Sequence, residues 1–269
     1  MESPDEHAAN GKPDIANLGF TPTIKVSGQW EVEKVLEEIP GGKPQSSSQS
    51  PLAFFHALER LKTTKREGWR RFGIERGESI SDHMYRMSII SMFAPASLAA
   101  RLDLHKCMKM CLIHDMAELL VGDITPVDGV PKPEKSRRES LTMDFLTKRL
   151  FGNKDDAAVG QEIRDVWTEY EEGKTLDSHY VHDIDKMELL LQMMEYERRA
   201  EGTLDLHEFA YVSELMTLPE TRAWADELIR ERESFWADKK AGRVHDEGQD
   251  DCELRTKKKT MQYEYYARE

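Results

Sequence analysis

The segment Cys111–Pro126, with the sequence CLIHDMAELLVGDITP, carries the side chains with the clearest capacity for chemistry. His114 and Asp115 are adjacent, and Glu118 follows His114 after about one helical turn. Neighbouring positions on a helix are about 100° apart, so both side chains can reach one ion at the helix surface. Ionisable groups in such an apolar helix are costly unless they are paired or bound to a metal. The segment therefore predicts part of a metal site.

Two further residues of ligand-forming types stand in apolar helical segments far away along the chain. His83 lies in SISDHMYRMS, and Asp185 lies in YVHDIDKMELLLQ. Two imidazoles with two carboxylates suit a divalent cation that keeps open positions for water, and we expect Mn, Co, Mg or a similar ion. Such an ion lowers the pKa of bound water and holds phosphate oxygens. The four residues together predict the hydrolysis of a phosphate ester.

Each of these residues also has an ordinary structural interpretation. A single histidine on an apolar helix is most often a core or surface residue, and a buried aspartate most often pairs with an arginine. Glu118 could support the site without touching the reacting atoms, and Asp123 could tighten the loop before Pro126. The structural interpretation of the two histidines leaves both aspartates unexplained, so the metal site is favoured for the set.

A basic segment, Lys62–Arg76, precedes the first histidine of this set. By default such a segment is a solvated face. The planar fork of arginine also suits a phosphate group, and Trp69 could stack on a base or a sugar. Because the segment is close in sequence to the predicted metal ligands, phosphate binding is favoured over the solvated face.

The order of an isolated His, a His-Asp doublet and a distant Asp resembles the signature of the HD superfamily. More closely, the chain is similar to the eukaryotic HD-domain 5′-deoxynucleotidases and, more loosely, to their bacterial relatives, over about Phe54 to Glu233. The resemblance implies hydrolysis of deoxynucleoside 5′-monophosphates to deoxynucleosides and phosphate. The matching strings are GW (68–69), ESISDHMYRM (78–87), HDMAELLVGDITP (114–126), PKPEKSRRE (131–139) and DIDKMELLLQMMEYE (183–197).

The same resemblance implies a role for each site residue. Glu118 would position or activate the attacking water, and Asp123 would contact the sugar or a metal-bound water. A second divalent ion in some members implies Glu118, Asp123 and the carbonyl of Ile124 as its ligands here. Arg66 and Trp69 correspond loosely to a bacterial pair that contacts phosphate and sugar, so both are expected to contact substrate, with Arg70 or Arg71 as alternatives for the phosphate. The family also implies a homodimer. The implied ligands of the first ion are His83, His114, Asp115 and Asp185.

Two rival functions remain open at this point. One is another HD phosphohydrolase, acting on cyclic nucleotides or on deoxynucleoside triphosphates. The other is a non-enzymatic helical scaffold that retains a structural metal. The basic segment and the GDITP turn (122–126) favour an enzyme over the scaffold.

Helical periodicity dominates from Leu52 onward and no segment alternates like a strand, so the sequence predicts an all-α fold. The resemblance implies that this fold is an HD-domain helical bundle. Three of the expected helices position the site residues. The first begins after an N-cap at Ser81 and runs to about Arg101 with an interruption at Pro95, the second covers 104–121 with Asp103 as its N-cap and Gly122 as its end, and the third covers 177–201. Further helices are expected over 133–152, 155–172, 207–216 and 220–240.

The expected domain organisation has three parts. Residues 1–51 read as a disordered N-terminal tail because of the Pro, Gly, Ser and Gln in 40–51, apart from a transient helix near 32–39. Residues 52–240 read as one HD phosphohydrolase domain. Residues 241–269 read as a polar C-terminal tail.

Composition limits the classes of binding partner and the cellular compartment that we expect for this protein. The formal net charge of −13 over 269 residues argues against binding to a nucleic-acid polymer. No run of about 18 apolar residues predicts a membrane span, and the N-terminus does not resemble a secretory signal. The three cysteines, Cys107, Cys111 and Cys252, do not have zinc-site spacing and read as free thiols. We therefore expect a cytoplasmic protein, with the nucleus left open.

Overall fold

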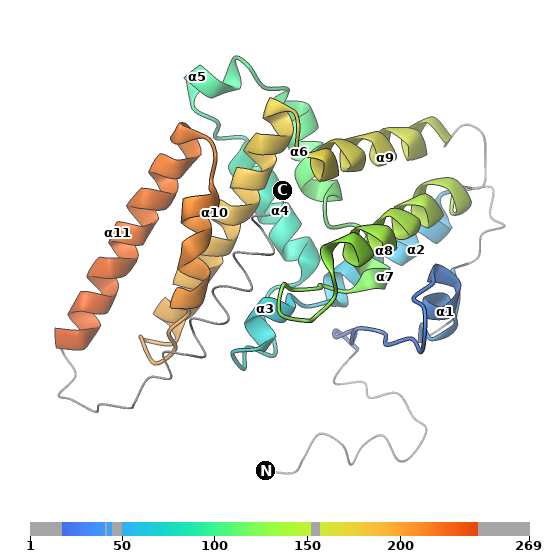
Figure 1. The fold of residues 1–269 in the computed structure, drawn as a ribbon, viewed down its shortest axis with the longest axis horizontal. Coiled ribbons are helices and arrows are strands. Elements are labelled where there is room, and N and C mark those ends of the chain that lie inside the picture. Colours follow the sequence, from blue (N-terminus) through green and yellow to red (C-terminus); the bar gives the residue numbers. More distant parts are fainter. Residues whose placement is uncertain (1–17, 41, 45–49, 152–156, 242–269) are drawn as a thin grey trace, which may run out of the picture. The chain divides into compact units, whose positions relative to one another are not determined.

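The structure is a computed structural model, and it describes residues 18–40, 42–44, 50–151 and 157–241. Within these ranges the protein is all-α, as predicted (Figure 1). The only β pairing in the described residues is an isolated bridge between Lys65 and Ser79. No described helix combines the length and the apolar character that a membrane crossing requires. The chain forms two compact units, which are described separately below.

The first unit comprises the described residues up to Asp82, together with Asp115–Thr125 and Val130–Arg164. At its centre lies the short helix α7 (Glu118–Val121), all four residues of which are buried and which packs against α1, α2 and α8. The guanidinium Nε of Arg60 on α2 donates to the carbonyl of Leu119, 2.5 Å away, and ties α2 to α7. The helices around α7 are α1 (Val32–Glu37), α2 (Leu52–Thr63), α3 (Glu67–Arg70), α8 (Lys132–Asp144) and the π-helix η3 (Phe145–Arg149).

The segment before α2 differs from the expected disordered tail. Helix α1 buries Val32, Val35 and Leu36, and Trp30 just before it is also buried. Apolar side chains on one side of a single helical turn gain burial only when another surface covers them, and here α7 and α8 supply that surface. The prediction of disorder over 1–51 is therefore wrong for the part that contains α1, whereas residues 1–17 lie outside the described ranges.

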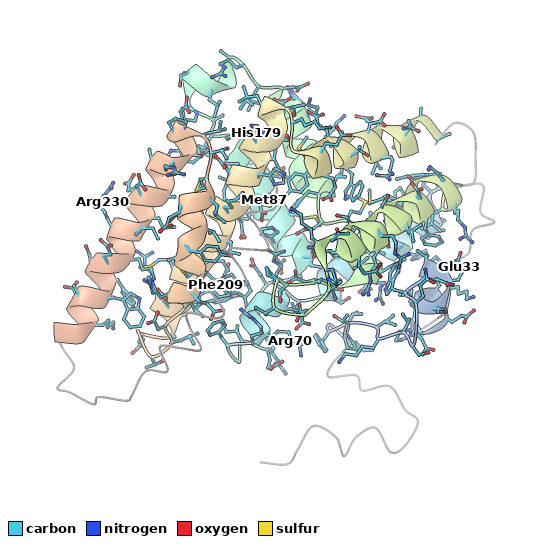
Figure 2. The ribbon with its side chains drawn as sticks, viewed as in Figure 1. Glu33, Arg70, Met87, His179, Phe209 and Arg230 are labelled. Atoms are coloured by element: carbon cyan, nitrogen blue, oxygen red, sulfur yellow. The ribbon has the colours of Figure 1, made fainter. Side chains whose placement is uncertain are left out.

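The second unit comprises His83–His114, Pro126–Gly129 and the described residues from Asp165 onward. Its central element is α10 (Leu176–Arg199), which packs against α6 (Leu104–Ile113), η4 (His207–Leu215, a 3-10 helix) and α11 (Pro219–Ala241). Tyr180, Ile184 and Leu190 of α10 are fully buried, as is Met87 of α4 (Ile80–Ser91; Figure 2). The remaining helices are α5 (Ala96–Ala99) and α9 (Ala157–Glu172), the latter beginning in the first unit.

Several helix ends follow from capping residues that the sequence displays. Asp103 accepts from the backbone N–H of Lys106 at 3.0 Å and begins α6, as predicted. Thr175 and Ser178 form a reciprocal capping box at the start of α10. Gly122 ends α7 with a φ of 79°, and a Cβ at this position would lie 2.8 Å from a methyl carbon of Thr23.

Two of the predicted helices differ from the structure in ways that matter for the site. Helix α4 begins at Ile80 and its capping pair is Ser79 with Asp82, whose side chains each accept from the other residue's backbone N–H. The predicted N-cap at Ser81 is therefore wrong, and the helix stops at Ser91, before Pro95. The predicted helix 104–121 is two helices, α6 and α7, and the His-Asp doublet lies between them.

Candidate metal centre

Two buried histidines face each other in the second unit. His83 projects from α4 and is fully buried, while His114 is the C-cap residue of α6 and is 4% exposed. Their ring centroids are 5.6 Å apart and the ring planes meet at 61°. At least one ring nitrogen of each lies within 4.8 Å of one from the other, which is close enough for both to bind a single ion.

Hydrogen bonds to Nδ1 select the tautomer of both rings. Nδ1 of His83 lies 2.5 Å from Oε2 of Glu188, and Nδ1 of His114 lies 3.0 Å from the carbonyl oxygen of Cys111. A carbonyl and a carboxylate only accept, so both Nδ1 atoms donate. In the neutral rings the lone pair is then on Nε2, which is the arrangement that a metal-binding histidine needs.

Asp185 completes this group of predicted ligands within the second unit. It lies on α10, and its Oδ1 is 3.2 Å from Nε2 of His83. The hydroxyl of Tyr170 donates to its Oδ2 at 3.3 Å, and the ring of Tyr170 lies 4.9 Å from that of His114. The Asp185 side chain is 29% exposed, so it borders solvent while both imidazoles are buried.

The remaining predicted site residues form a second group within the first unit. Arg66 NH1 lies 3.1 Å from Oδ2 of Asp115 and 3.7 Å from Oδ1 of Asp123. The other oxygen of Asp123 accepts from the backbone N–H of Glu67 at 2.6 Å. Asp123 therefore ties the GDITP turn to the residues around Arg66. Asp115 belongs to this group and follows His114 directly in the chain.

Glu118 is the most deeply buried acid of the first-unit group. Burial raises the pKa of its carboxyl well above the usual range, and the charges of Asp115 and Asp123 raise it further, while Lys135 and Arg66 oppose this. Lys135 Nζ is 3.7 Å from Oε1 of Glu118, and Oε2 has no hydrogen-bond partner in the described part of the chain. A buried carboxylate oxygen of this kind calls for a proton, a water molecule or a cation.

Trp69 lies in the interior of the first unit. It is 2% exposed, and its indole N–H donates to Oε1 of Glu78 at 2.7 Å. Stacking on a base or sugar requires an exposed ring face. The substrate contact of Trp69 stays a prediction, and it requires one face of the ring to become accessible.

These observations fit a resident divalent cation. Within the second unit, two oriented imidazoles and the neighbouring Asp185 provide nitrogen and oxygen donors of the kind that mid-row divalent ions accept. Within the first unit, the buried oxygen of Glu118 without a hydrogen-bond partner is a further donor of a suitable kind.

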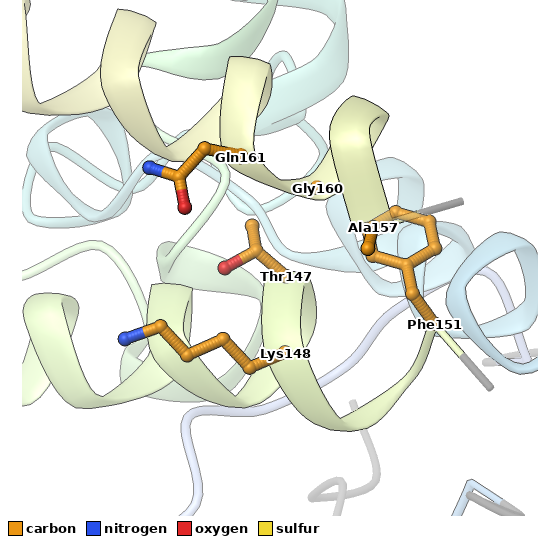
Figure 3. Close-up of a pocket in the computed structure, with 6 residues that line it drawn as sticks. All are labelled: Thr147, Lys148, Phe151, Ala157, Gly160 and Gln161. Atoms are coloured by element: carbon orange, nitrogen blue, oxygen red, sulfur yellow. The ribbon is translucent and has the colours of Figure 1, made fainter. Parts of the chain in front are cut away.

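A pocket of about 260 Å³ lies elsewhere in the first unit, between η3 and the start of α9 (Figure 3). It contains none of the predicted site residues. The side chains that line it are those of Thr147, Lys148, Phe151, Ala157, Gly160 and Gln161.

Comparison with known protein families matches residues 58–222, more than half of the chain, to the HD domain. The chain belongs to the HD domain family. It is 42% identical to the 5′-deoxynucleotidase hdd1 of Schizosaccharomyces pombe over 192 residues, which are 71% of this chain and 95% of that protein. It is 39% identical to the human 5′-deoxynucleotidase HDDC2 over 150 residues, which are 56% of this chain and 70% of that protein.

A solved structure of the HD domain family agrees with these sequence matches. The HD domain-containing protein YGK1 has a TM-score of 0.54 and 30% identity to this chain, covering 77% of this chain and 94% of that one. The range matched to the HD domain contains both groups of site residues described above.

Sequence reasoning missed three side chains that contact the predicted HD-domain residues: Glu188, Tyr170 and Lys135. Glu188 could have been found, because it stands three residues after Asp185, and the same helical spacing places Arg86 after His83. Tyr170 and Lys135 come from helices whose approach to the site depends on tertiary packing, so no local pattern marks them.

Proposed function

We propose that this chain is a metal-dependent 5′-deoxynucleotidase that hydrolyses deoxynucleoside 5′-monophosphates to deoxynucleosides and phosphate. The substrate class rests on the relatives named above, which are 5′-deoxynucleotidases at about 40% identity. The metal dependence rests on one observation in this chain, the facing pair His83 and His114 with both Nδ1 atoms hydrogen-bonded to acceptors.

The proposed ligands of the ion are His83, His114, Asp115 and Asp185. His83, His114 and Asp185 already lie together in the second unit, and Asp115 is joined to His114 by a peptide bond. The ion would be Mn, Co, Mg or a similar divalent cation, and when bound it lowers the pKa of water and neutralises phosphate oxygens.

The other polar residues would serve the substrate and the attacking water. Burial raises the pKa of Glu118, which makes its carboxylate a stronger base toward the attacking water. Arg66 has several N–H donors in a planar fork, and we assign it to the 5′-phosphate. Asp123 would contact the sugar or a metal-bound water, and Glu118, Asp123 and the carbonyl of Ile124 would hold a second divalent ion where one is bound.

We also propose the boundaries, assembly and location of the enzyme. The HD phosphohydrolase domain would span residues 52–240, with residues 241–269, nearly all of which lie outside the described ranges, as a polar tail. A homodimer would bury the exposed apolar side chains of Tyr85, Ile89 and Phe93 on and just after α4, and light scattering of the purified protein measures its mass. The cytoplasm is the proposed location, and microscopy of a fluorescent fusion of the full chain tests both this location and entry into the nucleus.

A panel of phosphorylated nucleosides tests the function. Purified protein loaded with Mn²⁺ is incubated with deoxynucleoside and ribonucleoside 5′-monophosphates, a deoxynucleoside triphosphate and a cyclic nucleotide, and released phosphate is measured. We expect phosphate from the deoxynucleoside monophosphates and little from the ribonucleoside forms. Release of pyrophosphate or triphosphate, or opening of the cyclic diester, would reject the proposed substrate.

Asp115→Ala separates the enzyme from a scaffold with a structural metal. We expect the activity of this variant to vanish while its far-ultraviolet circular dichroism stays that of the wild type. Asp226→Ala, an exposed acid on α11, is the matched control and keeps full activity. Turnover that persists in Asp115→Ala, or wild-type protein that binds metal and hydrolyses none of the substrates, contradicts the proposal.

A further inference from the structure

The buried carboxylate of Glu188 binds Nδ1 of His83, the ring nitrogen that does not face the proposed metal. Glu188 lies on α10, is fully buried, and uses both of its oxygens. Oε2 accepts from Nδ1 of His83 at 2.5 Å, and Oε1 accepts from Nε of Arg86 at 2.7 Å. An ionised carboxylate out of contact with water is tolerated only when it is paired and hydrogen-bonded, and both conditions hold here.

Arg86 fixes this carboxylate from the same helix that carries the histidine. It follows His83 by three residues on α4, so the two side chains project from neighbouring positions of one helix face. Its NH2 group also lies 3.3 Å from the carbonyl oxygen of Glu188 and 2.9 Å from Oε1 of Gln192. The guanidinium therefore hydrogen-bonds to residues on two successive turns of α10, which restricts the orientation of Glu188.

The two histidines obtain their orientation from different kinds of acceptor. For His114 the acceptor is the carbonyl of Cys111, three residues earlier on its own helix. For His83 the acceptor is a side chain from a distant segment of the chain. A carboxylate that accepts from the second nitrogen of a metal-binding histidine fixes its tautomer and makes the first nitrogen a better donor.

We propose that Glu188 is a positioning residue that fixes His83 as the Nδ1–H tautomer with Nε2 directed to the metal, and that Arg86 and Gln192 hold Glu188 in place. This inference rests on the metal ligand His83 of the proposed function. It assigns to Glu188 no contact with substrate or with the reacting atoms. Its expected effect is on metal affinity and on the protonation of one imidazole.

The tautomer of His83 in the wild-type protein gives the first test. Protein labelled with ¹⁵N at histidine, freed of metal, is studied by nuclear magnetic resonance, and the His83 signals are assigned from a His83→Gln variant. We expect Nδ1 to carry a proton, and in every neutral ring Nε2 to be the unprotonated nitrogen. A neutral ring with its proton on Nε2 and none on Nδ1 in the folded wild type overturns the proposal without any further variant.

Metal affinity gives the second test. Mn²⁺ binding is followed by the paramagnetic resonance signal of the free ion, at a temperature where every variant is folded. Glu188→Gln should raise the Kd for Mn²⁺ by about 10- to 100-fold and populate both tautomers of His83. Arg86→Gln, which leaves the bond from His83 to Glu188 possible, should raise the Kd less.

Glu197→Gln is the matched control. Glu197 lies on the same helix, is equally buried and is also paired with an arginine, Arg232, but does not contact either histidine. Its Kd for Mn²⁺ and its His83 tautomer should stay those of the wild type. If Glu188→Gln also leaves both readouts unchanged, Glu188 has only a structural role and the proposal is wrong.

The outcome is separable from that of the proposed function. Tautomer and Mn²⁺ affinity are measured without substrate, so an enzyme that proves inactive on deoxynucleoside monophosphates leaves this test intact. Conversely, a deoxynucleotidase whose Glu188→Gln variant binds Mn²⁺ like the wild type keeps its function and loses this inference.

Discussion

Helix α10 carries two fully buried glutamates with opposite consequences for the protein. Glu188 and Glu197 are nine residues apart, which is about two and a half helical turns, so they project from opposite sides of the helix. Each binds one arginine, Arg86 for Glu188 and Arg232 for Glu197. By residue type the two pairs are the same, and both glutamates are fully buried.

The two glutamates differ in the groups that they bind besides the arginine. Around Glu197 the donors are the backbone N–H of Leu206 at 2.7 Å, the indole N–H of Trp236 at 2.9 Å and two nitrogens of Arg232. Arg232 also donates to Asp205 at 2.9 Å and lies 3.2 Å from Nδ1 of His207, so this network joins α10 to α11 and to the chain at the start of η4. Around Glu188 the network continues through an imidazole whose other nitrogen faces Asp185.

A pair of aspartates repeats the same division on the two sides of α10. Asp183 accepts from the backbone N–H groups of Thr217 and Leu218 and from the hydroxyl of Thr221, which satisfies donors at the start of α11. Asp185, two residues later and about 200° around the helix, lies beside His83 instead. A buried acid on this helix is therefore informative only through what it binds.

The largest expected effect is on activity, at Asp185. In Asp185→Ala the metal-facing side of α10 loses its carboxylate, so we expect kcat/KM to fall by more than about 100-fold, beyond the loss typical of groups that only support a ligand. Because the side chain is partly exposed, the temperature of unfolding without metal should change little. Steady-state kinetics and calorimetry measure the two effects.

If Asp185→Ala instead keeps its activity and loses stability, Asp185 belongs with Asp183 and Glu197 as a structural acid. The comparison between the two sides of α10 would then fail at its most important residue.

The converse is expected at Glu197. Glu197→Gln breaks a buried ion pair with Arg232, which should lower the free energy of unfolding by about 3 kcal/mol and Tm by roughly 6–12 °C. Activity per folded molecule should not change, because no donor of this network touches a predicted site residue. Urea unfolding combined with phosphate release at low temperature checks both statements, and an activity loss at constant stability would contradict them.

The residues on the two sides of α10 differ in how readily sequence predicts them. The sequence offers four ligand candidates because ionisable residues in apolar helical segments need an explanation, and a metal would explain all four together. Glu188 was missed because a glutamate in DKMELLLQ also suits an exposed helix position, and only the packing of α4 against α10 buries it.

The position of the break between α6 and α7 also could not be predicted from the sequence. From Asp115 to Leu120 the chain follows i to i+3 hydrogen bonds, such as that from the Glu118 N–H to the Asp115 carbonyl, and so α6 does not continue into α7. Met, Ala, Glu and Leu are all good helix formers, so propensity predicts one continuous helix there. For Trp69, the sequence offers an aromatic ring near basic residues, and only the fold buries it against Glu78.

A smaller loss of stability is expected at Asp183. Asp183→Asn keeps the shape of the side chain but turns one acceptor into an NH₂ group that faces the donors of Thr217, Leu218 or Thr221. We expect the free energy of unfolding to fall by about 1–3 kcal/mol, the cost of a buried donor left without an acceptor. Chemical denaturation measures it, and Thr221→Val should remove part of the same interaction, so the double variant should lose less than the sum.

The smallest expected effect is at Tyr170 on α9, whose side chain contacts Asp185 and His114. Its hydroxyl donates to Asp185 over 3.3 Å, a long hydrogen bond to a partly exposed acid. Removal in Tyr170→Phe should cost about 0.5 kcal/mol, or about a twofold loss in kcat/KM, while the ring keeps its place beside His114 and, 4.0 Å away, His182. A loss approaching that of Asp185→Ala would mean that the hydroxyl reaches the substrate. Tyr170 would then be a catalytic residue as well, and the catalytic residues would come from α9 as well as from the side of α10 that carries Asp185.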